Sequence, residues 1–385
     1  MLSKRIRELA PSGTVALSNK VAKLKAEGVD VISFTLGEPD FTTPANVIRA
    51  AKDALDAGDT HYTPSLGIKV LREEIVRHIR AKNGIQASRD NVMVLPAKFA
   101  LYAAVQAIVD KGEEVIIPDP AWVSYVPMVQ LAEGKVRSVK MEFDDGWHLH
   151  ASDVEKAIRS RTKAIIINTP ANPTGSVMTR QELEEIARIA KEHDLYVIAD
   201  EVYEDLIFEG IHHSIASFEG MADRTITVAG LSMSYAMTGW RIGWIIGNTE
   251  FIDSVNKLQQ HSLTCLPGFV QKAALEALKG GAGSVEMMRR EFLERRNMLI
   301  PMINSIPGLS CEVPKGAFYA FFRADLGMDS MELSERLLEE AHVAMTPGSA
   351  FGQAGEGYMR MSYAASRKDI TEGMRRIKLF TEGSH

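Results

Sequence analysis

Along most of the chain, short apolar runs of strand length alternate with amphipathic segments of helix length. The strand-like runs lie at 31–34, 92–95, 114–117, 164–168 and 195–200, and the helical patterns at 46–57, 68–83, 99–109 and 180–193. Strands that alternate with helices form parallel βαβ units, in which each helix crosses one face of the sheet. The pattern therefore predicts an α/β fold, a mostly parallel open sheet with helices on both faces.

The last third of the chain has a different pattern. Charged helical segments at 287–302, 331–341 and 368–381 alternate with apolar strands at 316–322 and 357–363. They predict a smaller α+β domain beside the sheet. We expect an N-terminal arm that forms part of the small domain (1–44), a large domain (45–280) and a small C-terminal domain (281–385). We expect a helix at 267–278 to bridge the two domains.

Charge and composition exclude several classes of protein. The net charge of -6 provides no basic surface for nucleic acid or for an anionic membrane. The two cysteines, Cys265 and Cys311, fit no metal-ligand spacing, and we predict no metal site. No apolar run is long enough to cross a bilayer, and the first residues lack the apolar core of a signal peptide. We therefore expect a cytoplasmic protein.

Polar residues follow three of the predicted strands at the point where each strand ends. These segments are 168–175, 200–203 and 230–233. Ligands of open parallel sheets bind outside the carboxyl ends of the strands, so the three loops are expected to converge on one site. Simpler interpretations stay open for each segment taken alone: the prolines and glycines of the first suit any rigid turn, and Asp200 suits a helix cap.

The stretch 225–244 contains a strand, a polar turn and a second strand. A β-branched run at 225–228 leads through Gly230 into a small turn, and Arg241 stands just before the apolar run 242–246. One fixed cation in a turn between apolar strands indicates a site for an anion. An ordinary hairpin with a surface arginine fits the spacing equally well.

This stretch, which ends Met-Thr-Gly-Trp-Arg-Ile-Gly at 237–243, resembles the cofactor-lysine segment of the class I/II aminotransferases. These are fold-type I enzymes that use pyridoxal 5'-phosphate (PLP). The Asn-Pro-Thr-Gly run at 172–175 and the Asp-Glu-Val-Tyr run at 200–203 also match family motifs, and the resemblance extends from about 12 to 379. It implies an aspartate-aminotransferase-like enzyme that moves an amino group between an amino acid, aspartate or similar, and a 2-oxo acid.

The resemblance also implies where the cofactor binds, in the large domain. Asp200 pairs with the ring nitrogen, Asn172 and Tyr203 reach the phenolic oxygen, and Trp122 stacks on the ring, although a buried core tryptophan is the simpler interpretation of Trp122. The phosphate is bound by a further set: Ser232, Arg241 and the backbone amides of Ala97, Lys98 and Phe99 at a helix start. Tyr62 reaches the phosphate of the other subunit, which implies a homodimer with shared sites.

The substrate residues follow from the same resemblance. Gly37 belongs to a glycine loop beside the substrate, Asn172 contacts the substrate as well as the cofactor, and Arg360 takes the α-carboxylate. Arginine suits this task because its planar guanidinium donates two parallel hydrogen bonds to a carboxylate. The catalytic set comprises Asp200, Tyr203 and position 233.

Position 233 departs from the family, because Met233 stands where the family has the lysine that forms a Schiff base with PLP. A thioether forms no imine and carries no proton, so this chain is expected to be nearly inactive as a transaminase. PLP is then expected to bind noncovalently, or as pyridoxamine phosphate or an external aldimine. We disfavour Lys98 as a replacement lysine.

Three hypotheses account for Met233. The chain is an inactivated Lys-to-Met variant of a working aminotransferase, a natural pseudoenzyme that senses PLP or an amino acid, or an enzyme of C–S lyase type. We favour the first, because every other site residue of the family is in place. The sequence leaves the amino donor undetermined.

Overall fold

The structure, a computed structural model, describes residues 2–9 and 13–383. Its largest sheet has seven strands in the order β2-β8-β7-β6-β5-β3-β4. In chain order these strands are β2 (Val92–Leu95), β3 (Glu114–Asp119), β4 (Lys135–Lys140), β5 (Thr162–Asn168), β6 (Tyr196–Asp200), β7 (Thr225–Gly230) and β8 (Gly243–Ile246). Only β8 runs against its neighbours in this sheet, which confirms the predicted mostly parallel α/β architecture.

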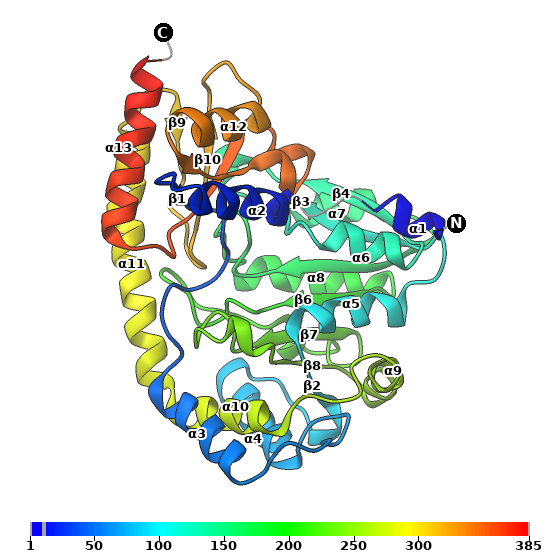
Figure 1. Cartoon of the computed structure of the whole chain (residues 1–385). Coiled ribbons are helices and arrows are strands. Elements are labelled where there is room, and N and C mark those ends of the chain that lie inside the picture. The colour runs from blue at the N-terminus through cyan, green and yellow to red at the C-terminus, as the bar shows by residue number, and fades with distance from the viewer. Residues whose placement is uncertain (1, 10–12, 384–385) are drawn as a thin grey trace.

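Helices cover both faces of this sheet (Figure 1). One face packs against α5 (Ala97–Ile108), α6 (Tyr125–Leu131) and α9 (Thr249–Gln260). The other face packs against α3 (Ala45–Asp56), α4 (Lys69–Asn83), α7 (Ala151–Ala157), α8 (Arg180–Glu192) and α10 (Gly268–Gly280). Alternate residues of one strand point to opposite faces, so Val197 and Ala199 join the core around α8 while Ile198 joins the core around α5.

Local chemistry determines where α8 begins. The side chain of Thr179 accepts from the N–H of Glu182 at 3.2 Å, and the carboxylate of Glu182 accepts from the N–H of Thr179 at 2.7 Å. This reciprocal cap satisfies N–H groups that have no partner inside the helix. It fixes the end of the 168–179 loop, which turns back from β5 towards α8.

A smaller α+β unit lies at one end of the sheet (Figure 1). Its antiparallel sheet has the order β12-β13-β10-β9. The strands are β9 (Leu309–Ser310), β10 (Tyr319–Ala324), β12 (Thr346–Pro347) and β13 (Tyr358–Ser362), and the helices are α2 (Gly13–Ala26), α12 (Ser330–Glu340) and α13 (Arg367–Gly383). From the N-terminal region, β1 (Ile32–Ser33) pairs with β11 (Val343–Ala344) of this unit, and a short helix α1 (Lys4–Arg7) comes before α2. The two boundaries between the three predicted domains stay a prediction.

The helix that links the two units is α11 (Ala282–Asn304), not the segment expected at 267–278. Figure 1 shows α11 running along one side of the molecule, with α13 beside it. Val285 of α11 lies in the core of the large unit, while Phe292 and Ile303 lie in the core of the small unit. Helix α10 packs instead in the core that contains α3 and α4. Both segments are amphipathic, and only packing distinguishes them.

None of the helices in the described part of the chain combines the length and hydropathy needed to span a lipid bilayer.

Candidate active site

A cavity of about 310 Å³ lies between the carboxyl edge of the large sheet and the small unit. The strands β2, β5, β6 and β7 are parallel and end at this edge, and the loops after them supply most of its walls. Eleven of the predicted site residues line the cavity: Gly37, Ala97, Lys98, Trp122, Asn172, Asp200, Tyr203, Ser232, Met233, Arg241 and Arg360. The predicted convergence of the three loops is therefore seen in the structure.

Two predicted residues lie elsewhere. The side chain of Phe99 lines an outer groove of about 710 Å³ rather than the cavity, although its N–H belongs to the first turn of α5. Tyr62 lines a second surface pocket beside Leu263, and its side chain is 88% exposed. Tyr62 has no contact with this chain's own cavity, because the loop that carries it lies on the outer surface.

Asp200 is the buried acid of the cavity. Its carboxylate accepts a hydrogen bond from the hydroxyl of Tyr125 at 2.6 Å and a longer one from the N–H of Val202 at 3.4 Å. Burial raises the pKa of Asp200 to about 6, against the opposing effect of the Tyr125 hydrogen bond. A carboxylate in this state is a strong acceptor for a protonated nitrogen.

Hydrogen bonds connect the loops after β5 and β6. Asn168 donates from its side chain to the carbonyl of Asp200 at 2.9 Å and accepts from the N–H of Asn172 at 2.8 Å. The hydroxyls of Tyr203 and Tyr319 are 2.8 Å apart, and burial raises the pKa of both phenols. Tyr319, which sequence reasoning missed, also limits position 37, because a Cβ on Gly37 would lie 2.6 Å from its hydroxyl.

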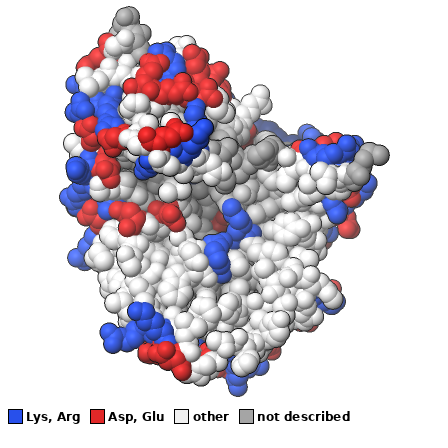
Figure 2. Space-filling view, in the orientation of Figure 1, with Lys and Arg blue, Asp and Glu red and all other residues white. Residues whose placement is uncertain are grey.

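Two cations and the start of a helix face one side of the cavity. Ala97, Lys98 and Phe99 form the first turn of α5, whose N–H groups have no acceptor within the helix. The pKa of Lys98 is lowered by burial and by the nearby guanidinium of Arg241. The ammonium of Lys98 also lies 5.0 Å from the centre of the Trp122 ring. Figure 2 shows Lys and Arg atoms near the centre of the view, with largely uncharged surface below and to the right of them. This concentration of positive charge suits an anion.

Arg360 is a buried cation whose hydrogen-bond partners are all neutral. It donates to the side-chain oxygen of Asn172 at 3.0 Å and to the carbonyl of Thr35 at 2.7 Å. Its Nε atom is buried without a hydrogen-bond partner. The guanidinium therefore retains donor capacity and an unbalanced charge, as expected of a receptor for a carboxylate.

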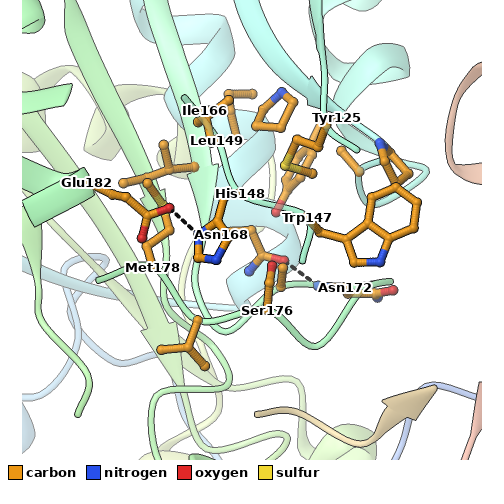
Figure 3. Close-up of a pocket in the computed structure, with 17 residues that line it drawn as sticks. Tyr125, Trp147, His148, Leu149, Ile166, Asn168, Asn172, Ser176, Met178 and Glu182 are labelled. Carbon is orange, nitrogen blue, oxygen red and sulfur yellow. Dashed lines mark hydrogen bonds and ion pairs between the residues drawn. The ribbon is translucent and has the colours of Figure 1, made fainter. Parts of the chain in front are cut away.

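A second, smaller cavity of about 30 Å³ adjoins the loop after β5 (Figure 3). Asn168 and Asn172 line it together with Trp147 and His148, and His148 pairs with Glu182 at 2.6 Å. This cavity has room for one or two water molecules and is too small for a substrate.

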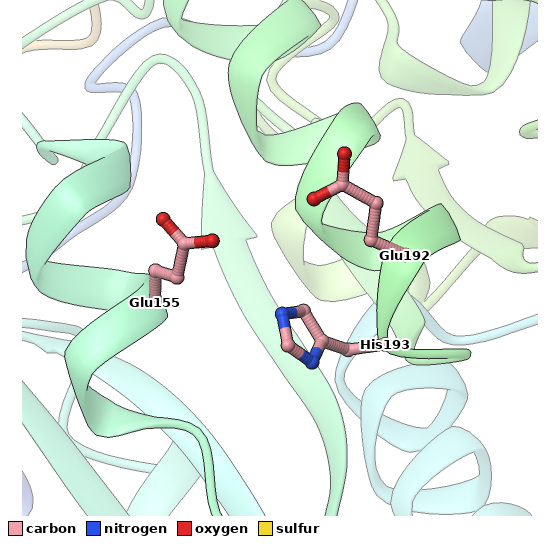
Figure 4. Close-up of side chains that lie close together, drawn as sticks. All are labelled: Glu155, Glu192 and His193. Atoms are coloured by element: carbon pink, nitrogen blue, oxygen red, sulfur yellow. The ribbon is translucent and has the colours of Figure 1, made fainter.

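The described residues contain two groupings with metal-ligand atoms, and neither points to a metal ion. Glu155, Glu192 and His193 lie on the surface (Figure 4), and Glu192 is already paired with Arg188. Glu201 and Glu204 are buried and His212 is partly buried, but the ammonium of Lys82 lies 3.3 Å from Glu204 and neutralises its charge.

The chain matches one family model, described as aminotransferase class I and II, over residues 29–377. It is 44% identical to an aspartate aminotransferase from Pyrococcus abyssi over 98% of this chain and 97% of that protein. It is 42% identical to aromatic-amino-acid aminotransferase 2 from Thermococcus litoralis, again over 98% and 97%.

A solved structure, aspartate aminotransferase from Thermus thermophilus with maleate, superposes with a TM-score of 0.95 at 39% identity. The match covers 98% of this chain and 99% of that one.

Proposed function

Because the chain belongs to the class I and II aminotransferase family, we propose that its cavity binds PLP together with aspartate or a similar amino acid. We further propose that Met233 occupies the position of the family's catalytic lysine. One observation supports this assignment above the others: Asp200, Arg360 and Met233 line the same cavity. Transamination with PLP requires an acid for the ring nitrogen, a receptor for a carboxylate and a residue at the lysine position.

The phosphate of PLP fits the side of the cavity formed by the first turn of α5, Ser232 and Arg241. Backbone N–H groups at a helix start and a guanidinium are both strong donors to a dianion. The pKa of Lys98 is lowered first by burial and second by the guanidinium of Arg241, and an anion bound beside these two cations would offset both effects.

The ring of PLP fits between Trp122 and the residues at the ends of β5 and β6. When bound, the cofactor withdraws electrons from the α-carbon of the amino acid. Asp200 favours the protonated ring nitrogen that this role needs, since a buried carboxylate is most stable beside a cation. Asn172 and Tyr203 offer donors for the phenolic oxygen. Arg360, with Asn172 and Gly37 beside it, binds the α-carboxylate of the substrate.

Met233 leaves the cavity without a group that transfers the α-proton. A placed proton carrier contributes about 10²–10⁴ in rate, so the chain as it stands should transaminate very slowly. PLP should then be held without a covalent link. A sensor of PLP or of an amino acid is the second candidate function, since it needs the binding residues and not the lysine.

Partner copies of this chain would complete the site. The exposed ring of Tyr62 and the outer groove beside Lys98 and Arg241 lie next to each other along the segment of Leu263 and Cys265. That segment joins α9 to α10 and crosses the uncharged face seen in Figure 2. We propose that this face pairs with a second copy in a homodimer. The cytoplasmic location stays a prediction.

The test of the proposed function is Met233→Lys. If the remaining parts are those of an aminotransferase, this variant should gain at least about 100-fold in turnover, the lower value for one proton carrier. Turnover is measured with a panel of amino donors and 2-oxoglutarate. The control is Met233→Ala, which removes the side chain and adds no amine. PLP binding without any gain in Met233→Lys would favour the sensor instead.

A further inference from the structure

Arginine side chains pack against aromatic rings at several places in the structure, and Arg360 differs from the others. The others that do so are Arg180, Arg295, Arg296, Arg323 and Arg336. Each of these also has a carboxylate within 4.0 Å. Arg360 has two rings against its guanidinium and, among the described residues, no ion pair.

Arg295 provides the closest comparison. It is as deeply buried as Arg360 and also packs against two rings, those of Phe41 and Phe292, at 5.2 and 5.6 Å from their centres. Two carboxylates balance its charge, Asp40 at 2.7 Å and Glu291 at 3.0 Å. At Arg295 the rings are therefore additional to a counterion, while at Arg360 they stand in its place.

The two rings at Arg360 come from separate elements and are themselves held firmly. The ring centre of Tyr319, on β10, lies 4.6 Å from the guanidinium carbon, and that of Phe351, on a short 3-10 turn at Gly348–Phe351, lies 4.8 Å from it. Both side chains are buried. The hydroxyl of Tyr319 bonds that of Tyr203, and the carbonyl of Phe351 accepts from the N–H of Ala121 at 2.8 Å.

A buried arginine without a counterion needs another source of favourable electrostatic interaction. The face of an aromatic ring carries partial negative charge and attracts a guanidinium most strongly where water is excluded. A carboxylate side chain would supply more attraction, but it would occupy the donors and repel an incoming carboxylate. Rings stabilise the cation through its faces and leave its N–H groups free.

We propose that Tyr319 and Phe351 are positioning residues that take the place of a counterion for Arg360 and hold its guanidinium ready for the α-carboxylate of the substrate. This inference rests on the proposed role of Arg360 in the function described above. Phe351 does not line the cavity. Its effect on ligand affinity therefore acts only through Arg360.

The experiment measures the affinity of the PLP-loaded protein for the dicarboxylate maleate by titration calorimetry, which needs no turnover. Phe351→Leu should bind maleate about tenfold more weakly, the loss expected for one desolvated cation–π contact. Phe351→Tyr keeps a ring at this place and should bind maleate as the parent does. PLP affinity, measured in parallel by fluorescence, should be unchanged in both variants.

A double-mutant cycle separates this inference from the proposed function. In an Arg360→Leu background, Phe351→Leu should have no further effect, because there is no cation left to position. If Arg360→Leu weakens maleate binding and Phe351→Leu does not, the aromatic pair has no positioning role. If Arg360→Leu itself binds maleate normally, the proposed role of Arg360 fails first. If Phe351→Leu loses PLP, a loss of maleate affinity in Phe351→Tyr would overturn the role of the ring, and retained affinity would support it.

Discussion

The protonation state of the Asp200 carboxyl group depends more on its buried surroundings than on the ordinary pKa of an aspartate side chain. Its folded-state pKa is raised to about 6 by burial, above its ordinary value of 3.8. The folded protein therefore binds this proton more tightly than the unfolded chain does. In the cofactor-free protein, this carboxyl group stabilises the fold less and less as the pH rises from about 4 to about 6.

Replacing Asp200 by Asn should remove this pH dependence. Relative to the parent, the cofactor-free Asp200→Asn protein should gain up to about 3 kcal/mol of unfolding free energy between pH 4 and pH 7. Urea denaturation across that range measures the change. Asp253→Asn, an exposed carboxylate on α9, is the control and should show no such trend. Parallel curves for the parent and Asp200→Asn would contradict the raised pKa.

At the scale of elements, a buried charged network joins α4 to the turn after β6. Glu201 accepts from the hydroxyl of Ser214 at 2.8 Å and lies 3.1 Å from His212, which is 3.9 Å from Glu204. Glu204 in turn lies 3.3 Å from the ammonium of Lys82, on α4. Since Glu201 follows Asp200 directly, the network supports the turn that begins next to the buried acid.

The imidazole of His212 should stabilise this turn most strongly at acidic pH. Burial alone would lower its pKa, but Glu201 and Glu204 outweigh burial and the repulsion from Lys82 and raise it above 6.5. Its stabilisation is therefore complete below pH 6.5 and is lost as the pH rises through the folded-state pKa.

Replacing His212 by Gln should cost about 3 kcal/mol of stability at pH 6, because it leaves a buried carboxylate without its cation. The loss should shrink above the folded-state pKa of His212. Urea denaturation at pH 6 and pH 9 measures both values. The adjacent His213 is the matched control: it is only partly buried and faces Arg180 and Glu184 instead. Equal losses at the two pH values would show that His212 is not charged in the fold.

For the molecule as a whole, the proposed homodimer explains the largely uncharged surface in the lower part of the view in Figure 2. Leu263 lies at the centre of this arrangement, since it lines both the outer groove and the pocket of Tyr62 and is 42% exposed. Exposed apolar side chains gathered in grooves mark interaction surfaces.

A charge at Leu263 should therefore separate the subunits. Leu263→Arg should weaken self-association by about 2–5 kcal/mol, the cost of burying an unpaired charge in an interface. Sedimentation equilibrium at several concentrations measures the change. Met331→Arg is the control, because Met331 is 50% exposed on α12 of the small unit, away from both grooves. Identical association of both variants would place the interface elsewhere.

The fold class can be predicted from the amino-acid sequence, and so, through the family motifs, can most of the residues that line the cavity. Alternating strand and helix patterns indicate a parallel sheet, and parallel strands end at one edge, so loops such as 168–175 and 200–203 must meet there. Local periodicity was also sufficient for β2, which the structure confirms at 92–95. The positions of strands, helices and the loops between them depend mainly on residues that are close together in the chain, so local sequence patterns can predict them.

The way in which distant parts of the chain meet depends on the packing of the whole molecule. Arg241 reaches the cavity because it precedes β8, the one strand of the large sheet that begins where its neighbours end. Tyr319 and Phe351 reach Arg360 because β10 and β12 both pair with β13, and Phe351 ends the 3-10 turn that follows β12. Strand direction and pairing arise from packing of the whole chain, so local sequence patterns carry no record of these contacts.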